Sequence, residues 1–542
     1  MTCNPVALSK KDQTHDLADE KVSTELHEQA PVVVTEADDK RIVRKTDARI
    51  LIILCLVYWL QVLDKTVLGY TAAINPGVKQ DANLTGNQYS TISSVAPYAQ
   101  IGCQPLGVYL LVRMPVRILL PLLMLLWGAA LMGMGGSTSF GSLVATRFLL
   151  GCFEASCLPA FSLITTAWYR RVEQPFRVAT WYSMNGIATI FGALIVWALS
   201  HGNYALHLHQ VTFLITGGLT IACVPITWYF LDNGPAEAKF LSADDRAKAV
   251  ERLRANQNST STNKFSWAQI GELALDPKTY LFATLALLVN VFNYTYNTFG
   301  PILLNGLAGL DSKTTLLLNL PFGALQVLVI LLMSWCAARF RQKGIFLALN
   351  YVPCLIAFAL LYALPRNRAN LGPLLFGFYL ISFAFGANPL LIGWIGANFA
   401  GSTKKAAIIS LFQACSAAGN IIAPNLFKES DAPQYRNALQ IILILTCVCL
   451  LNIAGLVAVL FYQNKRKMHQ RVKNGKPARI VDLSMSRKYN EDAARARRDD
   501  IEELPNSTMT DDQQISAVQN DTATEKQEDL TDKQNDEFVY LY

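Results

Sequence analysis

The chain has 542 residues, of which 52% are hydrophobic and only 16% are charged, with a formal net charge of +7. A mean hydropathy of +0.26 is too high for an ordinary soluble enzyme of this length, so the composition excludes that class and predicts an all-α membrane protein in a lipid bilayer. The basic residues do not form a nucleic-acid footprint, and we expect no nucleic-acid partner.

Apolar stretches near the roughly 18 to 20 residues that cross a hydrocarbon core recur along most of the chain, and we predict twelve transmembrane helices. Their predicted bounds are 48–72, 88–112, 116–136, 141–167, 177–200, 209–231, 277–304, 314–338, 344–364, 371–397, 405–427 and 437–462. A polar N-terminal tail, 1–47, precedes them. It lacks the basic start and short apolar core of a cleaved signal peptide.

The first predicted span carries two adjacent charged residues, Asp64 and Lys65. At 1.5 Å of rise per residue they lie ~22 Å along a helix that starts near Arg49, well inside the membrane. A carboxyl group there changes its protonation state when its surroundings change slightly. Asp64 is therefore a candidate proton-coupling residue, and Lys65 is a candidate contact for an anionic substrate. The alternative is an internal ion-pair network that closes one gate.

The fourth predicted span holds Arg147 and Glu154 in an otherwise apolar stretch. A charged side chain at the bilayer centre costs roughly 2.5 to 3.5 kcal/mol on insertion scales, so such residues usually face a bundle interior or a wet cavity. Their seven-residue spacing is nearly two helical turns, which places both on one helix face. We expect Glu154 to carry protons and Arg147 to meet the substrate. A structural ion pair between helices is the alternative.

Asparagine side chains recur in the later spans, although amides are unfavourable in lipid. The candidates for substrate binding are Asn185, Asn293, Asn297 and Asn420. Asn293 and Asn297 share a helix face because they are four residues apart, and tyrosines lie beside them. Simple interhelical hydrogen bonding, worth about 0.6 to 2 kcal/mol per contact, is the alternative.

The longest polar break between spans, 232–276, divides the twelve helices into six and six. We therefore predict two six-helix bundles, 48–231 and 277–462, joined by a cytoplasmic central linker. Within the linker, 235–254 is expected to form an amphipathic surface helix and 256–264 a flexible joint.

A weak internal repeat supports this division, because basic residues after the second span recur 226 residues later, after the eighth. The residues are Arg113, Arg117, Arg339 and Lys343, which we regard as a candidate gating motif at the cytoplasmic face. Two repeated halves fit alternating access, in which a substrate site near the midplane lies between halves that rock against each other.

Basic residues gather in alternate connections between spans, and short cytoplasmic loops collect Lys and Arg. The basic connections follow the second, fourth, sixth, eighth and tenth spans, and both tails flank the same side. Both termini are therefore predicted to be cytoplasmic. From about Gln463 the chain is polar, first basic and then mixed and acidic, so 463–542 is predicted to be a disordered cytoplasmic tail.

The sequence contains no HExxH, GxSxG, P-loop or dinucleotide-binding motif. Ten of the eleven cysteines fall within predicted spans, and no Cys or His cluster has metal-ligand spacing. We therefore expect no enzyme activity, no metal and no cofactor, with the proton as the coupling ion. The sequon at Asn83 lies in the first predicted external loop, where it could be glycosylated.

Several motifs follow one another along nearly the whole chain. They are Leu63–Tyr70, Gln88–Ser90, Arg147–Pro159, Trp168–Gln174 with Arg177, Leu231–Pro235, Asn398–Lys405, Gly419–Pro424, Ala432–Tyr435 and Asp532–Tyr540. Each motif alone is weak, but their order is specific. Together they resemble the major facilitator superfamily and, within it, the allantoate permease-like branch of the fungal anion:cation symporters.

The resemblance implies the major facilitator fold of two six-helix bundles and the uptake of small organic anions with protons. It implies that Asp64 and Glu154 are protonation sites and that Lys65 and Asn420 contact the substrate. Many relatives have arginine where Lys65 stands, and lysine lacks the guanidinium fork that binds a carboxylate at two points. Known substrates of the family include ureides such as allantoate, vitamins such as nicotinate, pantothenate and biotin, and small peptides.

We therefore predict a secondary active transporter of the plasma membrane, functional as a monomer, that imports a small carboxylate with protons. An internal membrane is the alternative location. A nutrient sensor of the same fold, which binds its ligand without transporting it, is the alternative function, and a channel is a third.

Overall fold

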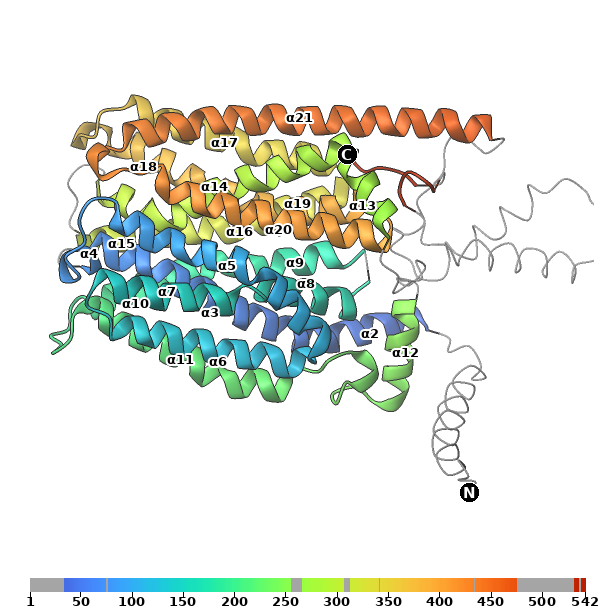
Figure 1. Ribbon diagram of the computed structural model, residues 1–542, viewed down its shortest axis with the longest axis horizontal. Coiled ribbons are helices and arrows are strands. Elements are labelled where there is room, and N and C mark those ends of the chain that lie inside the picture. Colours follow the sequence, from blue (N-terminus) through green and yellow to red (C-terminus); the bar gives the residue numbers. More distant parts are fainter. Residues whose placement is uncertain are drawn as a thin grey trace, which may run out of the picture.

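The computed structural model consists of helices that run side by side along one axis (Figure 1). The structure describes residues 34–74, 77–170, 172–254, 266–306, 312–340, 342–432, 434–474, 531–535 and 538–542. Within these ranges every regular element is a helix, which confirms the predicted all-α class. The predicted flexible joint, 256–264, lies outside the described residues.

The first half of the chain forms one bundle, drawn in blue and green in Figure 1. Its helices are α2 (Glu36–Thr46), α3 (Ile52–Ala73), α4 (Val78–Asp81), α5 (Gln88–Arg113), α6 (Val116–Gly135), α7 (Phe140–Glu154), α8 (Cys157–Trp168), α9 (Gln174–Tyr182), α10 (Met184–Leu199) and α11 (Leu208–Phe230). A π-helical turn, η1 (Asp47–Leu51), joins α2 to α3. The first helical stretch therefore begins inside the predicted polar tail.

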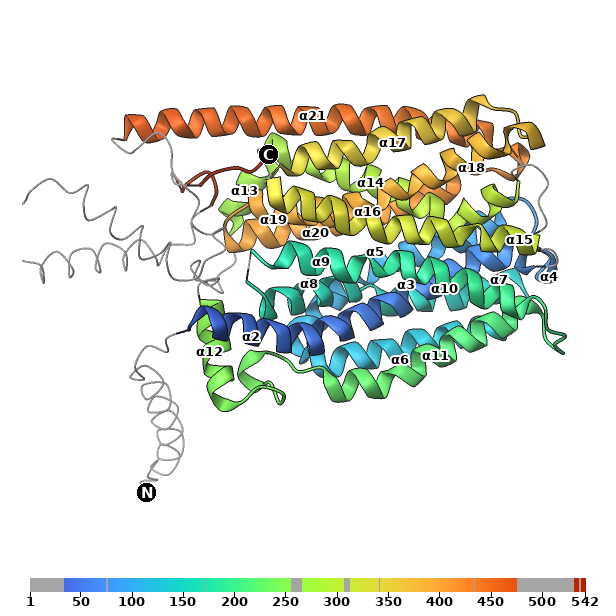
Figure 2. The same cartoon turned by 180° about the vertical axis from the view of Figure 1, so that it is seen from behind.

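The second half forms a second bundle, drawn in yellow and orange, and Figure 2 shows the same division from behind. Its helices are α14 (Pro277–Asn305), α15 (Ser312–Leu317), α16 (Asn319–Phe340), α17 (Lys343–Ala363), α18 (Leu371–Leu380), the 3-10 turn η5 (Ile381–Gly386), α19 (Ala387–Asn398), α20 (Ser402–Asn425) and α21 (Arg436–Lys473). Several predicted spans are thus built from two shorter helices in tandem, such as α7 with α8 and α18 with α19.

Ten helical stretches among the described residues are long and apolar enough to cross a membrane, and they match ten of the twelve predicted spans. The other two spans, 88–112 and 277–304, correspond to α5 and α14, which are long enough but less apolar. These two spans stay predictions. Both helices lie where the halves meet, α5 against α20 and α14 against α3, so many of their polar side chains face protein and not lipid.

The halves also touch backbone to backbone where α10 crosses α16. A Cβ atom added to Gly186 would lie 2.3 Å from the Gly323 carbonyl oxygen, and one added to Gly323 would lie 2.6 Å from the Gly186 carbonyl oxygen. Any larger side chain would separate the two helices. The two glycines therefore permit this close approach.

We call the end of the bundle that carries α12 (Ala243–Arg254) and α13 (Trp267–Ala274) the basic end, and the opposite end the far end (Figure 1). The basic end is the one that the loop charges predict to be cytoplasmic. The predicted surface helix 235–254 is shorter than expected, because α12 starts only after Ser242, whose hydroxyl accepts a hydrogen bond from the Asp245 N–H at 3.2 Å.

The linker is fixed to the first half by charge. The Asp245 carboxylate accepts hydrogen bonds from Lys45 at 2.7 Å and from Arg41 at 2.6 Å, both on α2. These two partners, Lys45 foremost, hold the pKa of Asp245 below its usual value. Arg252, which lies on α12 like Asp245, donates hydrogen bonds to Asp39 and Glu173. The polar residues before the first span are thus helical because α12 supplies their partners.

The predicted disorder from Gln463 onward is wrong for the described residues. α21 continues as a helix to Lys473, and 531–535 and 538–542 pack against the basic end of the second half. Composition suggested disorder because the segment has few apolar residues. The structure instead satisfies its polar groups with partners from distant helices.

Candidate functional site

A cavity lies between the two halves near the middle of the bundle. It contains about 740 Å³ of space not filled by protein atoms. Its lining residues are Tyr58, Gln61, Val62, Lys65, Ala96, Pro97, Gln100, Arg147, Leu150, Leu158, Tyr182 and Asn185 from the first half and Asn290, Tyr294, Asn297, Phe385, Asn388 and Asn420 from the second. Small-molecule sites are usually concave and combine apolar walls with a few polar groups. Nine of the eighteen side chains that line this cavity are amides or cations, so it is suited to a polar ligand.

An ion pair forms one wall of the cavity. Lys65 Nζ lies 3.0 Å from Glu154 Oε2, which also accepts a hydrogen bond from Gln100 Nε2 at 3.2 Å. The Glu154 side chain is fully buried, whereas the Lys65 side chain is 23% exposed. The lysine therefore faces the open space and the glutamate lies behind it. Glu154 pairs with Lys65 of α3, and not with Arg147 of its own helix.

Local sequence places Glu154 at this point. α7 ends at Glu154, and α8 begins three residues later with Pro159 in its first turn, where proline is tolerated. Gly151 allows α7 to approach α5, since a Cβ atom there would lie 2.4 Å from the Ala96 carbonyl oxygen. The close approach brings the end of α7 beside Gln100.

Arg147 is the second cation of the cavity. Unlike Lys65, it forms no ion pair among the described residues. Its side chain is almost completely buried at 2% exposure, and its Nε and Nη1 atoms have no hydrogen-bond partner in the described part of the chain. Asp64 and Tyr294 interact electrostatically with the guanidinium, but Nε and Nη1 still lack acceptors, which is unfavourable unless another group supplies them. A ligand carboxylate can do so, because arginine binds that group through two parallel hydrogen bonds.

Asp64 does not line the cavity. Its carboxylate is fully buried between α3 and α11, where Oδ2 accepts a hydrogen bond from Thr220 Oγ1 at 3.2 Å. Adjacent helical residues project about 100° apart, and here Lys65 faces the cavity whereas Asp64 faces α11. Asp64 faces the interior of the first bundle. Oδ1 has no partner among the described residues, which leaves it able to take a proton.

The predicted amides separate into two groups. Asn185, Asn297 and Asn420 line the cavity, whereas Asn293 does not. Asn293 is 5% exposed and neither of its amide atoms has a hydrogen-bond partner among the described residues. The four-residue spacing places Asn293 and Asn297 near one helix face, but the residues of α14 that line the cavity are Asn290, Tyr294 and Asn297, and Asn293 lies at the edge of their arc.

The structure adds residues that we did not select for the site. Asn388 Nδ2 donates to the Tyr182 hydroxyl at 2.7 Å and thereby joins the halves at the cavity. Asn290 Nδ2 donates to Ser416 Oγ at 3.0 Å. Gln61 could have been found from the sequence, since it precedes Lys65 by four residues and so shares its helix face.

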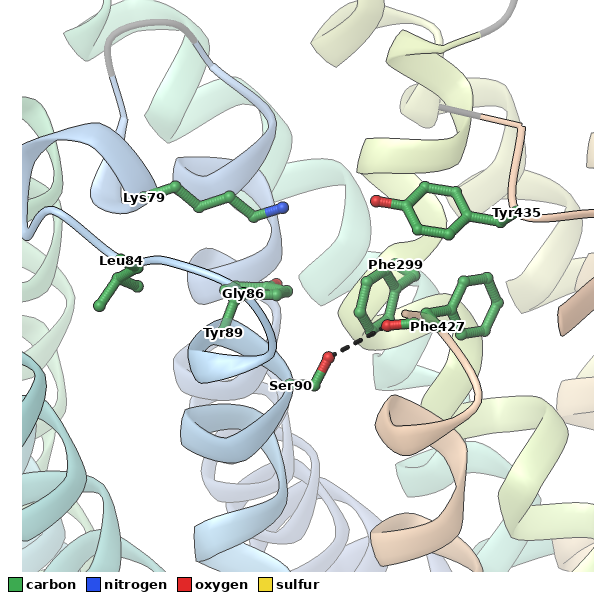
Figure 3. Close-up of a pocket in the computed structure, with 8 residues that line it drawn as sticks. All are labelled: Lys79, Leu84, Gly86, Tyr89, Ser90, Phe299, Phe427 and Tyr435. Atoms are coloured by element: carbon green, nitrogen blue, oxygen red, sulfur yellow. Dashed lines mark hydrogen bonds between the residues drawn. The ribbon is translucent and has the colours of Figure 1, made fainter. Parts of the chain in front are cut away.

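The halves are also joined at the far end. The Tyr89 hydroxyl donates to the Thr298 carbonyl at 2.9 Å, and Ser90 Oγ donates to the Phe427 carbonyl at 3.3 Å. A small pocket with about 330 Å³ of empty space lies at this junction, and Figure 3 shows Lys79 and Tyr435 pointing toward each other across it from opposite halves. These contacts hold the far end of the two bundles together.

The four candidate gating residues lie at helix ends on the basic end. Arg113 and Arg339 are exposed in the last turns of α5 and α16. The Arg117 N–H donates to Asn233 Oδ1 at 3.1 Å, and Lys343 Nζ donates to the Gly393 carbonyl at 2.6 Å. They are thus spread over both halves, away from the central cavity. Asn83, in the predicted sequon, is exposed in a turn after α4.

No group of three or more His, Cys, Asp or Glu side chains in the described ranges could hold a metal ion. The ten cysteines of those ranges are all free. The polar groups that line the cavity are the two cations and the surrounding amides and hydroxyls, and Glu154 lies behind Lys65. This set can bind an anion and exchange a proton.

Comparison with known proteins places this geometry in context. The family described as the Major Facilitator Superfamily matches residues 54–424. An uncharacterized transporter of Schizosaccharomyces pombe is 30% identical over 434 residues, which cover 80% of this chain and 81% of that protein. The Thiamine pathway transporter of Saccharomyces cerevisiae is 30% identical over 411 residues (76% and 77%), and the Allantoate permease of the same yeast is 27% identical over 495 residues (88% of each).

Solved structures show the same fold at low identity. A bacterial homolog of the human lysosomal transporter Spinster, in an inward-facing and unoccupied conformation, has a TM-score of 0.54 and 15% identity over 78% of this chain and 97% of that one. The nucleoside transporter NupG has a TM-score of 0.54 and 13% identity, over 76% and 99% of the two chains.

Proposed function

Because the chain belongs to the Major Facilitator Superfamily, and is thus a multi-pass membrane transporter and not an enzyme, we propose that it imports a small organic carboxylate together with protons. The basic end faces the cytoplasm, the protein resides in the plasma membrane, and one copy is sufficient for transport. The nearest chemical guide to the substrate is allantoate, from the name of one yeast relative.

The single observation that carries the proposal is Arg147. Its guanidinium is buried in the central cavity and lacks protein partners at Nε and Nη1 among the described residues. A protein that only needed a stable bundle would neutralise this charge with its own acid, as it does for Lys65 with Glu154. A substrate carboxylate supplies the missing charge and acceptors.

The Lys65 and Glu154 pair supplies the coupling. Protonation of Glu154 removes the negative charge that holds Lys65 at 3.0 Å, and the freed ammonium group then turns to the substrate anion. Proton binding and anion binding therefore favour each other, and linkage makes the effect reciprocal. Asp64, behind the same helix, is a second proton site that communicates with the cavity through movement of α3.

Alternating access completes the cycle. The cavity lies between the halves, and the far end is joined by hydrogen bonds such as Tyr89 to Thr298, so rocking must break those contacts to admit substrate from outside. The backbone contact of Gly186 with Gly323 lies on a helix crossing where one half can pivot on the other.

The test is uptake of labelled allantoate and nicotinate by cells that lack their own carriers, at pH 5 and pH 7.5, with and without a protonophore. Allantoin and nicotinamide, uncharged counterparts of the two acids, are matched controls. We expect saturable uptake of one acid, stronger at pH 5, abolished by the protonophore and absent for its uncharged counterpart. Equal uptake of acid and control, or saturable binding without accumulation, would contradict the proposal, and the latter outcome would favour a sensor.

A further inference from the structure

Residues 531–535 and 538–542, here called the tail segment, pack against the basic end of the second half, beside α13 (Figure 1). Thr531 and Asp532 are 0% exposed and Tyr540 is 2% exposed. None of them lines the central cavity, so carboxylate transport does not account for their burial.

Asp532 is the charged anchor of the tail segment. Its carboxylate bonds the Lys278 ammonium group and lies 2.7 Å from Lys404 Nζ. The two lysines stand in the first turns of α14 and α20, and all three side chains are fully buried. Burial acts to raise the pKa of Asp532, but the two ammonium groups outweigh it and hold the pKa below its usual value. Asp276 and Glu272 also lie beside these lysines, so Asp532 is one of three acids that compensate the two buried cations.

Two asparagines bind the backbone of the tail segment. The Tyr540 N–H donates to Asn464 Oδ1 at 2.9 Å, and its carbonyl accepts from Asn464 Nδ2 at 2.8 Å. The Leu541 N–H donates to Asn398 Oδ1 at 2.9 Å, and its carbonyl accepts from Asn398 Nδ2 at 3.0 Å. Each side-chain amide therefore pairs with both polar groups of one residue, as a neighbouring strand would.

Further contacts extend the same site over other helices. Trp394 Nε1 donates to the Leu541 carbonyl at 2.7 Å, and the Lys343 N–H donates to the Tyr542 carbonyl at 2.6 Å. Lys467 Nζ donates to backbone carbonyls of the segment at 2.8 Å. The partners come from α14, α17, α19, α20 and α21, so one short stretch of chain contacts the basic ends of five helices.

We propose that the tail segment is an intramolecular ligand, which occupies a peptide-binding site on the basic end of the second half and holds the ends of these five helices in one rigid arrangement. Its described residues add no helix to the bundle. Their contacts are those of a bound peptide, with the backbone paired to fixed side chains and one acid in a cationic pocket. Without the segment, Lys278 and Lys404 keep Asp276 but lose Asp532, the acid that lies nearer to both of them.

The first test compares two variants of the full-length protein in detergent, tagged at the N-terminus. Asp532→Asn should lower the melting temperature by about 5 °C or more, because breaking a buried ion pair leaves uncompensated charge. Asp244→Asn is the matched control, since it removes the same charge from an α12 side chain that is 65% exposed. It should shift the melting temperature by less than about 2 °C. Equal shifts, or no shift for Asp532→Asn, would overturn the proposal.

The second test keeps the proposal falsifiable if a variant fails to fold. A protease site inserted after residue 500 of the full-length protein allows the tail segment to be cut from the chain once folding is complete. Washing out the fragment, as checked by mass spectrometry, should lower the melting temperature, and a synthetic 531–542 peptide should restore it. The same peptide carrying Asp532→Asn should not restore it at equal concentration.

Three outcomes decide this second test. A fragment that stays bound through washing supports a tight intramolecular ligand. An unchanged melting temperature after the fragment has left would overturn the proposal, and so would equal rescue by both peptides. Neither readout measures transport, so this proposal and the carboxylate proposal can fail independently.

Discussion

The central cavity and the basic end of the second half both bury charge, but they do so in opposite ways. In the cavity, Arg147 lacks an ion-pair partner among the described residues. Lys65 pairs with the buried Glu154 on one side and faces the open space on the other. At the basic end, Lys278 and Lys404 are enclosed with acids on several sides. A buried charge with protein partners on several sides is compensated within the fold, whereas a buried charge that lacks them is open to compensation by a ligand.

The same contrast separates the two halves within the cavity. The first half contributes both charged lining residues, Lys65 and Arg147, and also three amides. The second half contributes no charged lining residue, and its polar groups are the hydroxyl of Tyr294 and the amides of Asn290, Asn297, Asn388 and Asn420. Charge gives a large and long-range attraction to an anion, whereas an amide gives a smaller and directional contact. We therefore expect the first half to govern coupling and the second half to govern the choice among carboxylates.

The largest effect that would test this contrast is expected from Arg147→Gln. Removal of the unpaired guanidinium should lower kcat/KM for the carboxylate on the order of 100-fold, because a buried charged contact to the substrate is lost. The melting temperature should stay within about 2 °C of the wild-type value, since no protein ion pair is broken. Uptake kinetics and thermal unfolding measure the two quantities.

Arg147→Lys is the matched control, because it keeps the positive charge but removes the guanidinium group that binds a carboxylate through two hydrogen bonds. It should retain more uptake than Arg147→Gln. If Arg147→Gln unfolds the protein instead of stopping uptake, the arginine has a structural role and the contrast between cavity and basic end is lost.

An intermediate effect is expected from Glu154→Gln. The glutamine cannot release a proton, so Lys65 stays free at every pH and uptake should no longer increase between pH 7.5 and pH 5. Exchange of labelled for unlabelled substrate across the membrane should continue, because that process needs no net proton movement. Asp64→Asn, measured in parallel, shows whether the acid behind the cavity also couples. A Glu154→Gln protein with the normal pH response would show that the pair is only structural.

The smallest effect is expected from Asn420→Ala. Loss of one amide contact should raise KM about 2- to 10-fold, as expected for a neutral hydrogen bond, and should change the ranking of carboxylates without removing the pH response. Gln413→Ala, on the same helix but outside the cavity lining, is the control and should leave KM unchanged. An altered pH response in Asn420→Ala would contradict the division of roles between the halves.

Much of the fold could be predicted from the sequence, because hydropathy marks membrane helices directly. The ten helical stretches that are long and apolar enough to cross a membrane lie at the predicted positions, to within a few residues at most ends. α5 and α14 carry weaker signals, since they meet other helices through polar side chains. The tail segment could not be predicted, because its composition is polar and its order depends on partners such as Lys278, far away in the chain.

Residue type alone was enough to identify the charged residues of the candidate site, but the sequence did not predict how these residues pair in space. Charges inside apolar spans pointed to Lys65, Arg147 and Glu154, and all three meet around the cavity. The sequence could not reveal that Glu154 pairs with Lys65, or that Asp64 faces the interior of its own bundle. Those facts depend on how α3 is rotated against α7 and α11, which helix periodicity does not determine.

Lys278 and Asp532 are 254 residues apart. During synthesis, α14 is made long before its acid, and every helix of the second bundle leaves the ribosome before the tail segment. Until the tail segment is made, the basic end of the second bundle is incomplete, and Lys278 and Lys404 lack one of their acids. The tail segment can dock only after those helices have been made, so the order of synthesis makes its docking a late step in the folding of the second bundle.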